Sequence, residues 1–224
     1  HFEFFLNSPD FALVMKNTII ISLLKFCIGF PAPIILALML NEVRRMRFKR
    51  IVQTVTYLPH FMSWVIIGGL VGSILATDNG SINMLLQKLN LINEPINFLS
   101  MPEYFKTILV STNIWKEIGF GSIVYLAAIA GVDPSSYEAA SIDGASRFKQ
   151  IYLITLPSIM PVVSIFMILA IGNLLSAGFE DILVLAPNPA LRDVSDVIDT
   201  YVIRVGVNNY RYSYATAVGL FKAV

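Results

Sequence analysis

Residues able to carry catalysis or to bind a transition metal are scarce in this sequence of 224 residues. It contains one cysteine, Cys27, and two histidines, His1 and His60. A disulfide framework needs paired cysteines, and a metal cluster needs several cysteines or histidines at short spacing, so both are excluded. Two histidines leave almost nothing for a His-based catalytic site. The phosphate-binding pattern GxxxxGK[ST] is also absent, which predicts that the chain cannot itself hydrolyse ATP.

The polar residues that remain of interest lie inside long apolar runs. Lys25 lies in the first run, and Asn113, Lys116 and Glu117 lie together in the third. An ionisable group in the middle of a membrane costs roughly 2.5–3.5 kcal/mol, so it usually faces the interior of a helix bundle or a water-filled path. Lys25 is therefore expected to snorkel, to face a wet cavity or to lie near an interface. Lys116 and Glu117 fit equally well as parts of a transport path or as buried partners of neighbouring helices.

The composition indicates that a membrane surrounds the elements carrying these residues. Hydrophobic residues make up 56% of the chain and charged residues 14%, whereas soluble domains have about 25% charged residues. The mean hydropathy is +0.70. The net charge of +1 argues against a nucleic-acid-binding protein, which would show a basic patch and a high pI. We expect an all-α integral membrane protein, a polytopic helical bundle that forms a single transmembrane domain over residues 1–224.

Five apolar runs are candidates for membrane spans, because a crossing needs about 20 predominantly apolar residues. The predicted spans cover residues 17–40, 57–75, 107–129, 157–179 and 212–224, and the last of them is truncated. Pro31 and Pro33 lack backbone donors and are expected to kink the first span.

Charges in the connecting segments predict the topology. Residues 41–53 form an expected loop with five bases against one acid. By the positive-inside rule this loop is cytoplasmic. The loop after the second span lacks a basic excess, and residues 180–211 hold five acids against three bases, so both are expected outside. The alternation of spans then places the segment between the third and fourth spans in the cytoplasm.

That cytoplasmic segment contains a predicted short helix at residues 134–144. Asp133 is a good N-cap residue and Pro134 suits the first helical position, so the helix is expected to begin there. Gly144 is expected to end it. Such a helix suits docking against a soluble partner. From the residues alone, an amphipathic linker that bends the chain back is the simpler interpretation.

The same segment carries a family resemblance. Its motif consists of Glu138-Ala139-Ala140, Gly144, Ile154 and Leu156-Pro157. This spacing matches the EAA loop of the membrane subunits of binding-protein-dependent ABC importers at each fixed position. The stretches LALMLNEVRRMRFKRIVQTVTYLPHFMSWVIIGG and AGVDPSSYEAASIDGAS also resemble the permeases of the carbohydrate-uptake, maltose-type branch, most closely those for polysaccharides and oligosaccharides.

The resemblance implies the fold and the function. The fold is that of a type I ABC importer permease with six spans in the intact chain, so one span is expected upstream of His1 and the last is expected to be completed beyond Val224. The function is that of a transmembrane permease subunit of an ATP-driven importer for sugars, which forms half of the translocation pore. The implied location is the bacterial cell membrane, with several passes through it.

The resemblance also implies how the chain is driven. The helix at 134–144 becomes a coupling helix seated in a groove of a separate ATP-binding subunit. The implied interface residues are Glu138, Ala139, Ala140, Asp143 and Gly144. The chain itself is then no enzyme and holds no cofactor, because the partner binds ATP. The implied partners are a second permease subunit, two ATP-binding subunits, an extracytoplasmic substrate-binding lipoprotein, the sugar and the bilayer, with no nucleic acid.

The substrate path is implied at two places. Relatives of the maltose type hold the sugar near the end of the helix that follows the EAA loop. Here that region contains Asn173, Ser176, Gly178, Phe179 and Glu180, and small residues replace the asparagine pair of the maltose type. Glu180 is interpreted equally well as an interfacial acid.

The third span contributes Asn113, Lys116 and Glu117 to the expected substrate path. A different class of function stays open for the same groups. In a self-contained ion-coupled secondary transporter, Lys25, Lys116 and Glu117 would relay ions.

Overall fold

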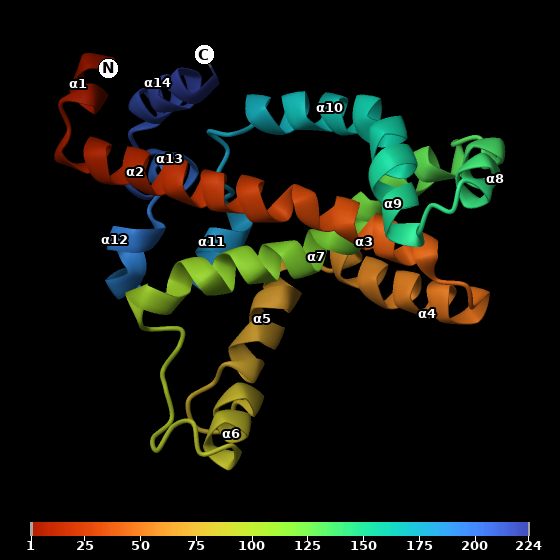
Figure 1. Cartoon of the computed structure of the whole chain (residues 1–224). Helices are drawn as coiled ribbons and strands as arrows, with labels where there is room; N and C mark the ends of the chain where they lie inside the picture. Colours follow the sequence, from red (N-terminus) through yellow and green to blue (C-terminus); the bar gives the residue numbers. More distant parts are fainter. Residues whose placement is uncertain (1, 224) are drawn as a thin grey trace. The chain divides into compact units, whose positions relative to one another are not determined.

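The computed structural model describes residues 2–223, and within this range the chain is helical and contains no strand (Figure 1). The helices group into two compact units. Unit 1 comprises residues 1–26, 62–113 and 174–224, and unit 2 comprises residues 27–61 and 114–173. Each unit is described by itself below.

Unit 1 contains the two ends of the chain. Its helices are α1 (Phe2–Leu6), α2 (Pro9–Leu24), α5 (Trp64–Ile74), α6 (Ser81–Lys88), α11 (Glu180–Leu185), α12 (Arg192–Ser195), α13 (Ile198–Ile203) and α14 (Tyr212–Ala223). The first part of α7 (Pro102–Ala130) also belongs to it. A 3₁₀ turn at Pro189–Leu191 precedes α12, and a π turn at Arg204–Asn208 follows α13.

Unit 2 contains α3 (Pro31–Glu42), α4 (Met46–Tyr57), the second part of α7, α8 (Pro134–Ile142), α9 (Arg147–Gln150) and α10 (Leu156–Gly172). A 3₁₀ turn at Leu58–Phe61 extends α4, and a π turn at Ile151–Thr155 joins α9 to α10. Another π turn, at Lys25–Gly29, joins α2 to α3. It lies within the first predicted span, just before the two prolines from which a kink was predicted.

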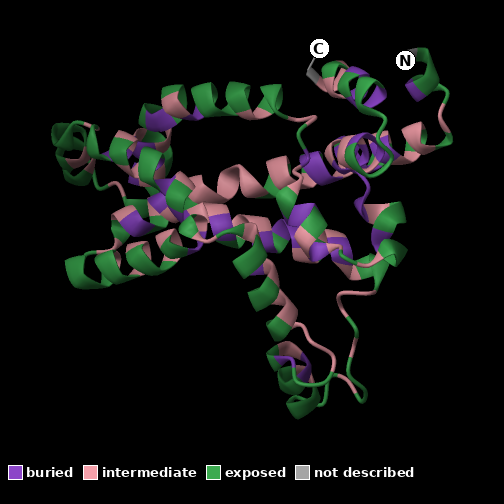
Figure 2. Cartoon of the chain, turned by 180° about the vertical axis from the view of Figure 1, so that it is seen from behind, coloured by how far each residue is buried: buried purple, intermediate pink, exposed green. Residues whose placement is uncertain are grey.

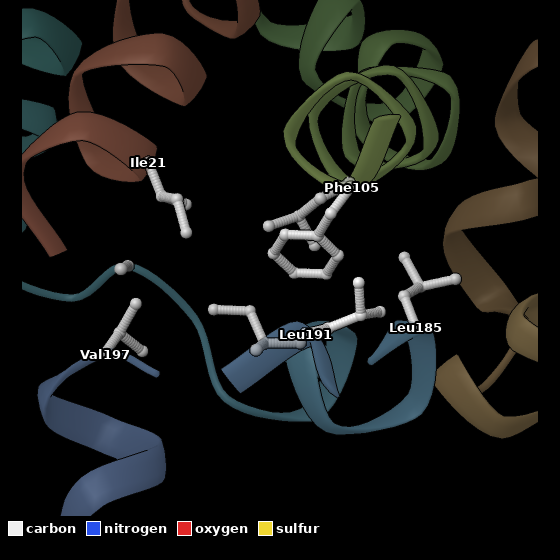
Figure 3. Close-up of a cluster of buried hydrophobic side chains, with 8 residues drawn as sticks. Ile21, Phe105, Leu185, Leu191 and Val197 are labelled. Carbon is white, nitrogen blue, oxygen red and sulfur yellow. The ribbon is translucent and has the colours of Figure 1, made fainter. Parts of the chain in front are cut away.

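Buried hydrophobic side chains form separate clusters within the units. In unit 1 one cluster gathers Ile21, Phe105, Leu109, Ala177, Ile182, Leu185, Leu191 and Val197. Figure 3 shows Ile21 of α2 and Phe105 of α7 pointing into the same space as Leu191. A second cluster in unit 1 includes Phe5, Val14, Ile198, Tyr201 and Tyr214. In unit 2, Ala37, Tyr125, Ile129, Ile159 and Val163 form the core.

The outward faces of several helices are apolar, which is the reverse of a soluble protein. Figure 2 shows α4 and α10 with mostly exposed residues. On α10, Ile165, Ile168 and Leu169 are each more than half exposed. Large exposed apolar surfaces need a lipid or protein environment. Among the described residues, the helices Pro9–Glu42 and Arg147–Gly172 are long and apolar enough to cross a membrane, and counting two bent pairs as spans raises the number to four.

Three predicted segments differ from the observed helices. The second predicted span, 57–75, is no continuous helix, because the chain leaves the helical path after Phe61 and Ser63 caps a new helix by accepting a hydrogen bond from the N–H of Ile66. The fourth, 157–179, is helical only to Gly172. The loop predicted at 41–53 is corrected in large part to α4, since neither Gly nor Pro interrupts the residues from 46 to 57.

Candidate functional site

The helix α8 begins and ends at local signals. Asp133 is the N-cap, and its side chain accepts a hydrogen bond from the N–H of Ser135 at 2.9 Å, which lowers the pKa of the Asp133 carboxyl. Pro134 occupies the first turn. At the other end Gly144 has a φ of +74°, the left-handed conformation that commonly ends helices and favours glycine. The helix begins at Pro134, as predicted, and ends at Ile142, two residues before the predicted end at residue 144.

The residues expected at the interface lie on α8 and directly after its last residue. Glu138, Ala139, Asp143 and Gly144 are exposed, Ala140 is half-buried, and α8 has no buried residue. Within residues 2–223, Glu138 forms no ion pair. Ile142 is 86% exposed in the same unit. This surface offers a carboxylate, small side chains and one apolar side chain to a partner.

The opposite side of α8 is tied to the start of the following long helix. The hydroxyl groups of Tyr137 and Thr155 lie 2.9 Å apart. The buried Gln150 donates from Nε2 to Ser141 Oγ at 3.0 Å and to the carbonyl of Ala145 at 3.1 Å. These polar contacts connect α8 to α9 and to the π turn before α10. Tyr137, Gln150 and Thr155 were not predicted as functional residues, and nothing in their spacing marks them.

Lys116 and Glu117 both contact the turn at Leu58–Phe61. Lys116 is buried, and its Nζ donates to the carbonyl of His60 at 2.6 Å and to that of Pro59 at 3.4 Å. Glu117 Oε2 lies 2.9 Å from His60 Nδ1. The His60 ring stacks on Phe120 with centroids 3.9 Å apart. Of the two interpretations of Lys116, these contacts support the buried structural partner.

A cavity of about 530 Å³ within unit 2 brings two predicted path residues together. Glu117 and Asn173 both line it, with aromatic walls that include Phe120, Tyr125 and Phe166. Glu117 is the one charged residue among its described lining residues. Cavities of this size and apolar character, with a few polar groups, are the usual form of sites for small molecules.

The other predicted path residues belong to unit 1. Ser176 and Glu180 are exposed, while Phe179 and Asn113 are half-buried. Gly178 has a φ of +106° and follows the buried Ala177. Of these residues, Gly178 lies directly beside an ionic contact that was not predicted, since a Cβ at this position would meet both Lys25 and Asp181.

Lys25 is paired. Its Nζ donates to the carbonyl of Ala177 at 2.6 Å and forms a salt bridge with Asp181. The expectations for Lys25 did not include such a partner, and its place relative to a membrane interface stays a prediction. The sequence contained enough information to suggest Asp181 as the partner. A lysine within an apolar span needs a partner, and the predicted topology places both Asp181 and the start of the first span on the outer side.

Within the part of the chain that the structure describes, no group of three or more His, Cys, Asp or Glu side chains is arranged to hold a metal ion. The chemistry available at these places is hydrogen bonding, ion pairing and contact with aromatic rings.

Two solved structures have the same fold as this chain. A crystal structure of a bacterial ABC transporter involved in the import of the acidic polysaccharide alginate matches with a TM-score of 0.95 and 45% identity. It covers 100% of this chain and 77% of that chain. A bacterial alginate ABC transporter in complex with an alginate pentasaccharide-bound periplasmic protein matches with the same TM-score and 44% identity, covering 100% of this chain and 76% of that chain.

Two curated proteins of Bacillus subtilis (strain 168) are similar over nearly the whole chain. Protein LplB is 46% identical over 222 residues, which are 99% of this chain and 69% of that protein. The polygalacturonan/rhamnogalacturonan transport system permease protein YteP is 47% identical over 223 residues, which are 100% of this chain and 68% of that protein. The family model described as binding-protein-dependent transport system inner membrane component matches residues 29–223. The chain therefore belongs to the family of inner membrane components of binding-protein-dependent transport systems.

Proposed function

We propose that this chain is the transmembrane permease subunit of an ATP-driven importer for oligosaccharides or polysaccharide fragments, and that it forms half of the translocation pore. The observation that carries the proposal is the exposed, capped helix α8, which carries Glu138 and Ala139 of the EAA motif and is followed by Gly144 of the same motif. Similar permeases that are named for polygalacturonan and rhamnogalacturonan transport, and transporters that take alginate, support the sugar class.

In this proposal α8 transmits force. Glu138 supplies a polar contact to a groove of the ATP-binding subunit, Ala139 and Ala140 allow a close fit, and Gly144 turns the chain back toward α9. ATP-driven closure of two ATP-binding subunits pulls the coupling helices of two permeases together. The contacts of Tyr137 with Thr155 and of Ser141 with Gln150 carry that movement from α8 to the segment before α10.

The proposed assembly contains this chain, a second permease, two ATP-binding subunits that bind the ATP, and an extracytoplasmic substrate-binding protein in a bacterial cell membrane. The intact permease is proposed to have six spans, five of which fall in this sequence as one transmembrane domain. The solved structure of an alginate transporter in complex with an alginate pentasaccharide-bound periplasmic protein supports the substrate-binding protein as a partner.

The proposed sugar path includes Glu117 and Asn173, which line the cavity in unit 2. It also includes four residues that come after Asn173 in the sequence, namely Ser176, Gly178, Phe179 and Glu180. Aromatic faces beside carboxylate, amide and hydroxyl groups suit a sugar ring, which has apolar faces and a polar edge. Asn113 is included as a half-buried polar group of the same span as Glu117.

An ion-coupled secondary transporter is less well supported by the contacts. Lys25, Lys116 and Glu117 are each engaged with a protein partner, so none stands ready as an open relay. Uptake by this chain reconstituted without ATP-binding subunits, driven by an ion gradient, would instead favour that function.

The test is Glu138→Lys in the complete transporter. We expect loss of uptake of labelled alginate and galacturonate oligosaccharides and loss of transport-coupled ATP hydrolysis, with membrane insertion unchanged. The matched control is Glu94→Lys, which makes the same charge change at an exposed residue outside α8. Normal uptake by the Glu138→Lys transporter would contradict the proposal.

A further inference from the structure

The contact between Lys25 and the segment after α10 joins residues that are far apart in the chain. Lys25 is the first residue of the π turn that follows α2, and its Nζ donates to the Ala177 carbonyl at 2.6 Å and to Asp181. The side chains are 15% and 4% exposed. Both sides of the contact lie in unit 1.

The neighbouring backbone needs such a contact. Residues 176–179 are in neither a helix nor a turn, so regular backbone hydrogen bonds do not fix their conformation. Two anchors hold Ala177 instead. Its methyl group lies in the hydrophobic cluster with Ile21, and its carbonyl accepts from Lys25, four residues after Ile21 and on the same face of the helix.

Gly178 lets the backbone close over the ion pair. A Cβ at this position would lie 2.5 Å from Asp181 Oδ1 and 2.8 Å from Lys25 Nζ, which is closer than atoms can approach. Its φ of +106° is also a conformation that other residues rarely adopt. This glycine therefore serves the contact with Lys25 and Asp181, a role that differs from touching a sugar.

Stability alone is a weak explanation for the pair. Taking a lysine and an aspartate out of water is unfavourable for each ion, and apolar residues of similar volume often stabilise a protein equally well. The ion pair does what apolar residues cannot, because it selects one carbonyl and one carboxylate and fixes their direction. This contact gives the Ala177 carbonyl of loop 176–179 a defined hydrogen-bond donor.

We propose that Lys25 and Asp181 are positioning residues of the transport path, which hold loop 176–179 so that Ser176 and Phe179 face the sugar in a fixed arrangement. This inference rests on the proposed function, in which the loop lines the path. Neither residue contacts the sugar. Their effect on transport goes through the backbone of Ala177 and Gly178.

The first test is Lys25→Met in the complete transporter, with Lys25→Arg as the conservative variant. Hydrogen exchange of the amides of residues 174–182 is expected to speed up at least about tenfold in Lys25→Met, because the loop opens locally once its anchor is gone. The KM for uptake of a labelled alginate pentasaccharide or oligogalacturonide is expected to rise more than the maximal rate falls. Lys25→Arg is expected to keep most of both properties.

The second test keeps both charges. Gly178→Ala places a methyl group against the pair and is expected to reproduce the faster exchange and the raised KM. Gly172→Ala is the matched control, since a Cβ there would meet nothing within 4 Å. If the Lys25→Met protein is too unstable to assemble, the result for Gly178→Ala decides whether the proposal holds.

The proposal is overturned if Lys25→Met or Gly178→Ala assembles with wild-type exchange in residues 174–182 and an unchanged KM. It is also overturned if Gly172→Ala produces the same changes. The exchange measurement needs no transport, so it separates this inference from the proposed function. A transporter in which Glu138→Lys keeps full uptake while Lys25→Met speeds exchange would refute the coupling role of α8 alone.

Discussion

Helix α8 and loop 176–179 are held in place in opposite ways. The conformation of α8 is set at its ends by neighbours in the chain, through Asp133, Pro134 and Gly144, and no residue of the helix is buried. The loop has no regular structure, and its Ala177 is fully buried and hydrogen-bonded to Lys25, 152 residues earlier in the chain. An exposed helix can be stabilised by the residues at its own ends, whereas a buried loop without regular structure can only be fixed by the elements around it.

This difference predicts unequal responses to mutation. Changes at the ends of α8 should alter that helix and leave the remaining structure intact. Changes at the ion pair should affect the whole of unit 1, because an unpaired charge would be left among buried residues.

The largest effect is expected at the ion pair. Lys25→Met leaves the Asp181 carboxylate buried without its partner and should lower the free energy of unfolding by about 3 kcal/mol. The double variant Lys25→Met/Asp181→Leu should recover much of this loss, since no charge remains unpaired. Unfolding of the purified transporter in a denaturing detergent titration measures both. If Lys25→Met unfolds no more easily than the wild type, the expected difference in sensitivity between the ion pair and α8 does not exist.

An intermediate effect is expected at Gly144. Because its φ is +74° and a Cβ there would meet no atom within 4 Å, Gly144→Ala changes only the backbone energy, by roughly 1 kcal/mol. Hydrogen exchange at the carboxyl end of α8 should increase, and transport-coupled ATP hydrolysis should fall. Gly172→Ala serves as the control with an equally open site and no positive φ. If the two variants behave alike, the left-handed conformation is not what ends α8.

The smallest effect is expected at Asp133. Its ionised carboxyl caps α8, and the hydrogen bond from Ser135 lowers its pKa in the folded protein. A lowered folded pKa means that the stabilisation is fully present above the unfolded value of about 4 and is lost as the pH falls through the folded value. Protection of the first amides of α8 from exchange should therefore decline in acid.

Asp133→Asn is the control for that titration, because asparagine is an equally good N-cap and does not ionise. Its protection should be similar at neutral pH and insensitive to acid, while Asp133→Ala should lose protection at every pH. An acid response that persists in Asp133→Asn would assign the titration to another group.

The extent to which each region was predictable follows from where its determinants lie. The ends of α8 depend on residues within a dozen positions, so Asp133 and Pro134 predicted its start, and Gly144 predicted its end to within two residues. The fourth predicted span extended to residue 179 because the residues after Gly172 are largely apolar. Its helix ends earlier, and the contact that holds the segment after it involves Lys25, which no local pattern connects to Ala177 or Asp181.

The segment at 41–53 shows the reverse case. Its five bases predicted a cytoplasmic loop, although most of the same residues also favour a helix. The helix α4 begins at Met46, after the extended backbone of Arg45 separates it from α3. Lys116 and Glu117 contact the turn at Leu58–Phe61, which lies 56 or more residues earlier in the chain. The sequence around either residue does not indicate that contact.

The π turn at Ile151–Thr155 determines which side chains can face α8. In a regular α-helix, residues five apart point about 140° away from each other, since each residue turns the helix by 100°. Gln150 and Thr155 are five apart, yet Gln150 reaches Ser141 and Thr155 reaches Tyr137 on the same short helix. The wider turn brings them into line, and Thr155 donates to the carbonyl of Gln150, five residues back. The junction between α8 and α10 therefore depends on the angle by which the chain turns between Gln150 and Thr155. Deleting or inserting one residue there would change that angle and separate the two helices, although every residue that makes the contacts would still be present.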